Sequence, residues 1–128
     1  MNLISHFIVS AVLAAILYPF VGAYAFLVLV SGFLIDADHY IYYVFKYKNL
    51  NPLKANRLFT DRKLVGVFCV FHTVEVLAVV SVLALFTMSG RLLLLGLVVH
   101  HLMDFYHESK INRLDSKVRS IIGYALKK

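Results

Sequence analysis

Residues 22–45 read GAYAFLVLVSGFLIDADHYIYYVF, an apolar run that continues through Asp36, Asp38 and His39. A helix that crosses a bilayer needs about 20 predominantly apolar residues, and this run is long enough. Ionisable groups are costly inside a bilayer and are by default interpreted as part of a functional site. The stretch therefore predicts a membrane helix that carries part of a polar site.

The composition of the whole chain agrees with this interpretation. The 128 residues fit one domain, the hydrophobic fraction is 61% and the mean hydropathy is +0.80. A soluble domain of this size could not bury so much apolar surface, so we expect an integral membrane protein. Cys69, the only cysteine, lies in an apolar run and is interpreted as a small core hydrophobe.

Three further apolar stretches predict helices at residues 3–18, 64–88 and 92–105. The first is expected to end at Pro19, and only the stretch at 64–88 is comfortably long enough to span. The predicted fold class is an all-α integral membrane protein, with four transmembrane helices in a bundle over residues 1–110. Residues 111–128 are expected to form an amphipathic interfacial helix, and residues 54–59 a short helix in a loop.

Basic residues set the expected orientation. Of the 13 lysines and arginines, only Arg91 lies outside the segment at 46–63 and the tail from Lys110 onward. The positive-inside rule places that segment and both termini in the cytoplasm, in a protein of the cytoplasmic (inner) membrane. The net charge of +6 is then a mark of topology and of contact with lipid headgroups, and no nucleic-acid partner is expected.

The ionisable residues of the apolar stretches are candidate metal ligands. The predicted topology places them in the same cytoplasmic half of the bilayer, and spacings of three or four residues let pairs of them share a helix face. Asp38 leaves the face shared by Asp36 and His39 in a regular helix, so either the helix loosens there or Asp38 acts from outside the ligand set. The candidates are His6, Asp36, Asp38, His39, His72, Glu75, His100, His101 and Asp104.

Imidazole and carboxylate donors without a thiolate suit a divalent metal, zinc first, with manganese or iron as alternatives. The number of candidates allows one or two ions. Two ions bridged by a carboxylate would activate a water for displacement at a phosphoester. Asp38 or Glu75 is the expected catalytic group, bridging metals or taking a proton from that water.

The order of these motifs resembles a known family. GFLIDADH at 32–39, FHTVE at 71–75 and GLVVHHLMD at 96–104, after an early histidine, resemble the predicted membrane-bound metal-dependent hydrolases, the YdjM-like family of inner-membrane proteins. The resemblance implies a zinc-type helical metal site, similar to that of zinc-dependent phospholipase C and related nucleases. Its metal residues would be His6, Asp36, Asp38, His39, His72, His100 and Asp104.

The chain also departs from that family pattern. Many members carry His-Arg-Gly-x-x-His-Ser before the third helix, whereas here only His72 and Thr73 remain, followed by Glu75. The number of metals and the residue that would contact a phosphate therefore stay open.

Three functions are consistent with these sequence features. The leading one is a membrane-embedded metal-dependent hydrolase, or phosphoesterase, acting on a lipid headgroup or lipid-linked phosphate at the cytoplasmic side. The alternatives are a protein that binds or transports a metal ion, and a non-catalytic membrane partner subunit. Membrane lipids are the expected partners, and exposed apolar helix faces also allow a homo-oligomer.

Overall fold

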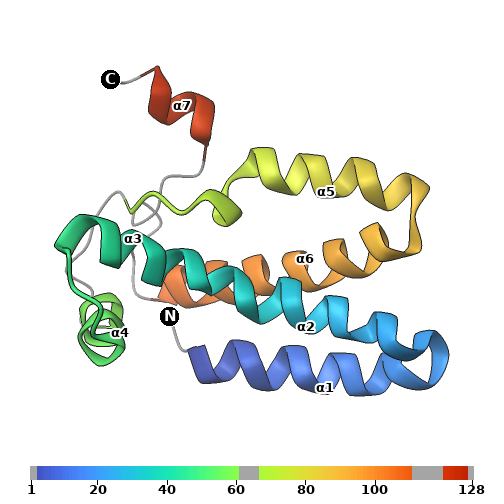
Figure 1. Ribbon diagram of the computed structural model, residues 1–128. Helices are drawn as coiled ribbons and strands as arrows, with labels where there is room; N and C mark the ends of the chain where they lie inside the picture. Colours follow the sequence, from blue (N-terminus) through green and yellow to red (C-terminus); the bar gives the residue numbers. More distant parts are fainter. Residues whose placement is uncertain (1–2, 61–66, 111–119, 127–128) are drawn as a thin grey trace.

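The computed structural model describes residues 3–60, 67–110 and 120–126, which form helices and no β-strand (Figure 1). The all-α prediction is confirmed for these residues. Four long helical segments lie side by side and nearly parallel in axis, in the order α1, α2, α6, α5 across the molecule. The elements are α1 (Leu3–Val21), η1 (Gly22–Ala25), α2 (Phe26–Phe33), η2 (Leu34–Asp36), α3 (Ala37–Tyr47), α4 (Pro52–Thr60), η3 (Val70–His72), α5 (Val74–Phe86), α6 (Met88–Lys110) and α7 (Ile121–Ala125).

The first helix ends later than predicted. Pro19 lies inside α1 rather than terminating it, and the helix continues to Val21. A proline in the last turn removes only one helical hydrogen bond, which is why it does not stop the helix outright. Gly22, with a φ of +58°, adopts the left-handed conformation that glycine tolerates, and the chain then reverses through η1.

The second predicted helix consists of two α-helices that follow each other in the same direction. α2 and α3 are joined by the 3-10 turn η2, and Phe33 leaves helical geometry with a φ of −125°. The break shifts the faces that follow it, so Asp36, Asp38 and His39 are all buried although a regular helix would separate Asp38 from the others. Of the two alternatives that the sequence left open for Asp38, the loosened helix is the one observed.

The prediction of one continuous helix at 64–88 is wrong. Val67–Cys69 is not helical, η3 follows, and α5 begins only at Val74. A long-range contact accounts for the late start, because the carboxylate of Asp38 accepts a hydrogen bond from the backbone N–H of Phe71 at 3.1 Å. Thr73 then stands in extended geometry directly before α5.

α6 is the central helix and packs closely against α2. A Cβ added to Gly96 would collide with the Ser31 hydroxyl and would lie 2.5 Å from the Val28 carbonyl oxygen of α2. The missing side chain therefore allows the two backbones to approach. This crossing lies one helical turn before His100, so it fixes the position of the polar residues that follow.

Within the described residues, two helical runs, not four, are long and apolar enough to cross a membrane by length and composition: Leu3–Tyr47 and Met88–Lys110. The first run contains the hairpin of α1 with α2 and α3, while α5 is a shorter apolar helix of 13 residues. The helix in the third predicted stretch is short because that stretch begins with residues that are not α-helical.

The short loop helix predicted at 54–59 is present as α4. It begins at Pro52, and the Asn51 side chain before it accepts hydrogen bonds from the N–H groups of Leu53 and Lys54.

The predicted tail helix at 111–128 falls largely outside the described residues. Within the described part, only the five-residue α7 is helical.

Candidate metal centre

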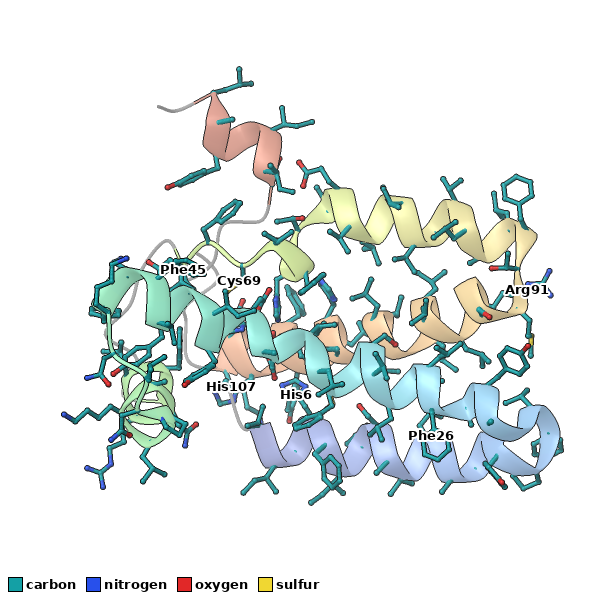
Figure 2. The ribbon with its side chains drawn as sticks, in the orientation of Figure 1. His6, Phe26, Phe45, Cys69, Arg91 and His107 are labelled. Atoms are coloured by element: carbon teal, nitrogen blue, oxygen red, sulfur yellow. The ribbon has the colours of Figure 1, made fainter. Side chains whose placement is uncertain are left out.

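Four chain segments bring their polar side chains to one level of the molecule. The turns η1 and α5–α6 lie at one end, and the site lies toward the other end, where α1 begins and α6 finishes (Figure 1). His6 points from α1 toward α2 and α6, and Cys69 lies beside α3 (Figure 2). The common level predicted from topology is therefore observed for residues of α1, η2, α3, η3 and α6.

The centre of the site is a set of four donor atoms that we call the primary group: His72 Nε2, His100 Nε2, Asp36 Oδ1 and Asp104 Oδ2. The two imidazole nitrogens are 3.0 Å apart. Asp36 Oδ1 lies 3.5 Å from His72 Nε2 and 3.6 Å from His100 Nε2. Asp104 Oδ2 lies 3.6 and 3.4 Å from the same two nitrogens.

These separations match the edges of a metal coordination tetrahedron. An ion with ligands at about 2.0–2.2 Å in tetrahedral geometry separates its donor atoms by roughly 3.3–3.6 Å. Four of the five edges given above lie within or close to this range, and the His72–His100 edge is about 0.3 Å shorter. The four distances between an imidazole nitrogen and a carboxylate oxygen therefore suit a divalent ion of the size of zinc.

The hydrogen bonds behind the two imidazoles direct their lone pairs inward. His100 Nδ1 lies 2.9 Å from the Gly32 carbonyl oxygen, which can only accept, so Nδ1 carries the proton. His72 Nδ1 lies 3.1 Å from Asp38 Oδ2 and donates to it in the same way. Both Nε2 atoms of the neutral rings then present lone pairs to each other, an arrangement that needs a proton or a cation between them. Carboxylate and carbonyl partners of this kind are the usual support of metal-bound histidines.

Asp36 gives the strongest indication that the primary group binds a cation. Its residue is 5% exposed, and neither carboxylate oxygen has a hydrogen-bond donor among the described residues. A buried polar atom without a partner is costly, and a buried carboxylate more so. A divalent ion in the primary group would balance the two negative charges of Asp36 and Asp104, which is the neutral arrangement that a low-dielectric interior favours.

His6, on α1, contacts the primary group from outside. Its ring stacks on His100 with centroids 4.2 Å apart, and its Nε2 lies 3.2 Å from Asp104 Oδ1. His6 is thus placed to hold the second oxygen of Asp104, and it also forms a possible ligand set with Asp36 and His100.

A second group adjoins the first and contains a residue that the sequence interpretation missed. Asp38, His39, Cys69 and His72 are all buried and offer donor atoms that lie within 4.8 Å of one another. Cys69 was interpreted as a core hydrophobe because its neighbours in sequence are apolar. The spacing Cys69-x-x-His72 was the available signal, since two such residues in one short segment often share a metal ion.

Two predicted ligands are not brought into either group. Glu75 faces α7, where its Oε1 accepts hydrogen bonds from the Ser120 hydroxyl at 2.6 Å and from the Ile122 N–H at 3.2 Å. The Ser120 bond lowers the pKa of Glu75 to about 2. His101 turns its Nδ1 to the Leu97 carbonyl oxygen at 2.8 Å, and its ring centroid is 5.9 Å from that of His72.

Two cavities reach the site. One, of about 380 Å³, lies between α5 and α6, touches His72, His101 and Asp104, and is otherwise mainly apolar. The other, of about 280 Å³, lies between α1, α3 and α4 and touches Asp36 and His39. The primary group is therefore approached from two sides.

Comparison of the chain with protein-family models, with curated proteins and with solved structures finds no match. The class that fold and site define is an all-α protein with two candidate membrane spans and buried histidine–aspartate groups that could hold a metal ion.

Proposed function

We propose that this chain is a membrane-embedded, metal-dependent hydrolase that acts on a phosphoester of a lipid headgroup or lipid-linked phosphate at the cytoplasmic side. The observation that carries the proposal is the primary group, in which each of two buried carboxylates lies 3.4–3.6 Å from two inward-facing imidazole nitrogens. A divalent ion bound there would polarise a phosphoryl oxygen and lower the pKa of a bound water.

The wall of the larger cavity supports a lipid as the substrate. Val74 and Leu77 of α5 and Val98, Leu102 and Phe105 of α6 line a space that ends at His72 and Asp104. An acyl chain would contact these apolar side chains, while its phosphate would lie beside the metal ligands. Large apolar side chains that are exposed around the helices support placement in a bilayer, among them Ile4, Ile8, Phe20, Phe45, Leu85, Phe86 and Leu102.

We assign the general base to His101 in place of Asp38 and Glu75. Asp38 Oδ2 is engaged by Phe71 and His72, and Glu75 is engaged by α7. His101 lines the larger cavity, and its Nδ1 bonds the Leu97 carbonyl, which leaves Nε2 as an acceptor. That Nε2 is buried and has no hydrogen-bond partner among the described residues, and we propose that it accepts the proton of a water bound at the primary group.

The two adjacent histidines of α6 provide the test. In purified protein loaded with zinc, we expect hydrolysis of a long-chain alkyl phosphoester in mixed micelles. His100→Ala should lose both metal and turnover, whereas His101→Gln should keep its metal and lose about 100-fold or more in kcat. Full metal content without turnover of long-chain phosphoesters would overturn the hydrolase, and unchanged turnover in His101→Gln would overturn the base.

Metal binding without catalysis is the second candidate function. The observation in its favour is the depth of the ligands, because His100 is 0% exposed and the other three residues of the primary group are also buried. Closed ligand sets of this kind are typical of structural metal sites. Zinc-bound protein with no turnover but with a large loss of stability on chelation would support this alternative.

A further inference from the structure

We propose that Cys69 is a thiolate ligand in a second metal position, formed with Asp38 and His39 and completed by His72, that takes a thiophilic divalent cation such as Zn²⁺. The inference rests on the proposed metal centre but not on hydrolysis. It assigns metal binding to Cys69, which the apolar residues around it in the sequence would otherwise identify as a small core hydrophobe.

The surroundings of Cys69 are polar and buried. Cys69 is 1% exposed, and its Sγ lies within 4.8 Å of a ligand atom of each of Asp38, His39 and His72. A cysteine that acts only as a small hydrophobe packs against apolar side chains. The ligand atoms of these four buried side chains, from α3, η3 and the segment before η3, instead gather within 4.8 Å of one another.

The donor spacing suits an ion that contains sulfur among its ligands. Zinc binds thiolate at about 2.3 Å and imidazole at about 2.0–2.1 Å, so the ligand atoms of a tetrahedral site lie roughly 3.3–3.8 Å apart. All four donors lie within 4.8 Å of one another, so the group is at most about 1.5 Å wider than such a site. His39 Nδ1 and Asp38 Oδ1 are 2.9 Å apart, about 0.4 Å closer than that range, so this pair would separate slightly on binding.

The charge count also favours a second ion. Binding releases the Cys69 proton to solvent and leaves a thiolate, whose charge together with that of Asp38 balances one divalent cation. The primary group reaches the same neutrality with Asp36 and Asp104. In each of the two adjacent positions, two acidic side chains would then balance the two positive charges of the ion, which offsets much of the cost of burial away from water.

His72 links the two positions. Its Nε2 belongs to the primary group, and its Nδ1 contacts Asp38 at 3.1 Å. An ion in the second position that binds Nδ1 would break the Asp38–His72 hydrogen bond and release the Nδ1 proton to solvent, which leaves His72 as an imidazolate shared between the two ions. Filling one position should therefore change the affinity of the other.

The absence of any other cysteine makes a direct test available. In the whole chain Cys69 is the only cysteine, so any thiolate-to-metal charge-transfer absorption must come from it. We titrate metal-free protein with Co²⁺ and record near-ultraviolet absorption and stoichiometry. We expect a thiolate-to-cobalt band and two ions per chain, with the band lost and one ion left in Cys69→Ala.

A matched variant separates the two positions. His100→Ala removes a ligand from the primary group only, and it should keep the thiolate band while its stoichiometry falls to one. Binding of one ion by the wild type with no thiolate band would overturn the Cys69 assignment and leave the proposed function standing. Binding of no ion at all would overturn both. Cys69→Ser, a near-isosteric change, keeps the test valid if the alanine variant does not fold.

Discussion

At the scale of single residues, Asp36 is the side chain that depends most on a cation. Its carboxylate is buried beside the imidazoles of His72 and His100 and lacks a hydrogen-bond donor among the described residues. In metal-free protein this buried charge is balanced only by the neighbouring imidazoles. In metal-loaded protein the same charge supplies a ligand and part of the charge balance.

Asp36→Asn should therefore change the stability in opposite directions in the two states. In excess chelator the variant should be at least as stable as the wild type, because a neutral amide can donate to the imidazoles. With zinc at about 100 times the wild-type Kd, the wild type gains about 2.7 kcal/mol, and the variant should gain little. Thermal unfolding with and without zinc measures both effects.

Glu75→Gln is the matched control for that experiment. It is the same carboxylate-to-amide change, but at a residue that faces Ser120 and Ile122 instead of the metal groups. It should keep the full zinc-dependent gain in stability. Equal loss of the gain in both variants would contradict the placement of the site.

At the scale of the helices, the close approach of α2 and α6 at Gly96 controls the site. Gly96, His100 and Asp104 lie at successive turns of one face of α6, and His100 bonds to Gly32 of α2. Any separation of these two helices moves His100 away from its carbonyl partner. Packing and metal affinity are therefore coupled at this crossing.

Gly96→Ala should cost roughly 1–3 kcal/mol of stability, because the added methyl meets backbone atoms of Val28 and Gly32. It should also weaken zinc binding by about 10-fold or more through displacement of His100. Gly123→Ala in α7 is the control, since its Cβ would meet nothing closer than 3.4 Å and should leave zinc affinity unchanged. Isothermal titration and thermal unfolding test both variants. Unchanged stability and zinc affinity in Gly96→Ala would contradict the close approach of α2 and α6.

How much the sequence could predict differs between elements. The helical character of α1, α2, α3 and α6 and the common level of His6, Asp36, His100 and Asp104 follow from apolar runs, helical spacing and the distribution of basic residues. The late start of α5 could not be predicted, because it depends on a hydrogen bond between Asp38 and Phe71, 33 residues apart. The partner of Glu75 lies 45 residues away, in a tail that the sequence predicts as an interfacial helix and not as a neighbour of Glu75. Cys69 acquires polar neighbours only through the same tertiary contacts.

At the scale of the whole molecule, the two ends of the helical bundle differ in charge. One end carries the turns at Gly22–Ala25 and around Thr87, near which Arg91 is the basic residue. The other end carries the α3–α4 connection and the end of α6, with Lys46, Lys48 and Lys110. This asymmetry supports the proposed position of the candidate metal site near the cytoplasmic surface.

Two exposed positions test that orientation in intact cells. In a Cys69→Ala background, Met88→Cys at the turn end should react with a membrane-impermeant maleimide added outside. Leu50→Cys at the other end should react only after the membrane is permeabilised. Met88 and Leu50 are 48% and 73% exposed, so access through the protein does not limit either reaction. The reverse pattern would contradict the orientation, and equal labelling of both positions would contradict insertion.

The central claim is that the buried imidazoles and carboxylates of four chain segments hold a divalent cation between them. Its most direct test is the metal content per chain, measured by elemental mass spectrometry on protein purified in detergent without chelator and then equilibrated with zinc and desalted. The wild type should retain at least one ion, and the double variant Asp36→Asn/His100→Ala should retain none in the primary group while remaining folded. Wild-type protein that is folded and retains no metal would contradict the account.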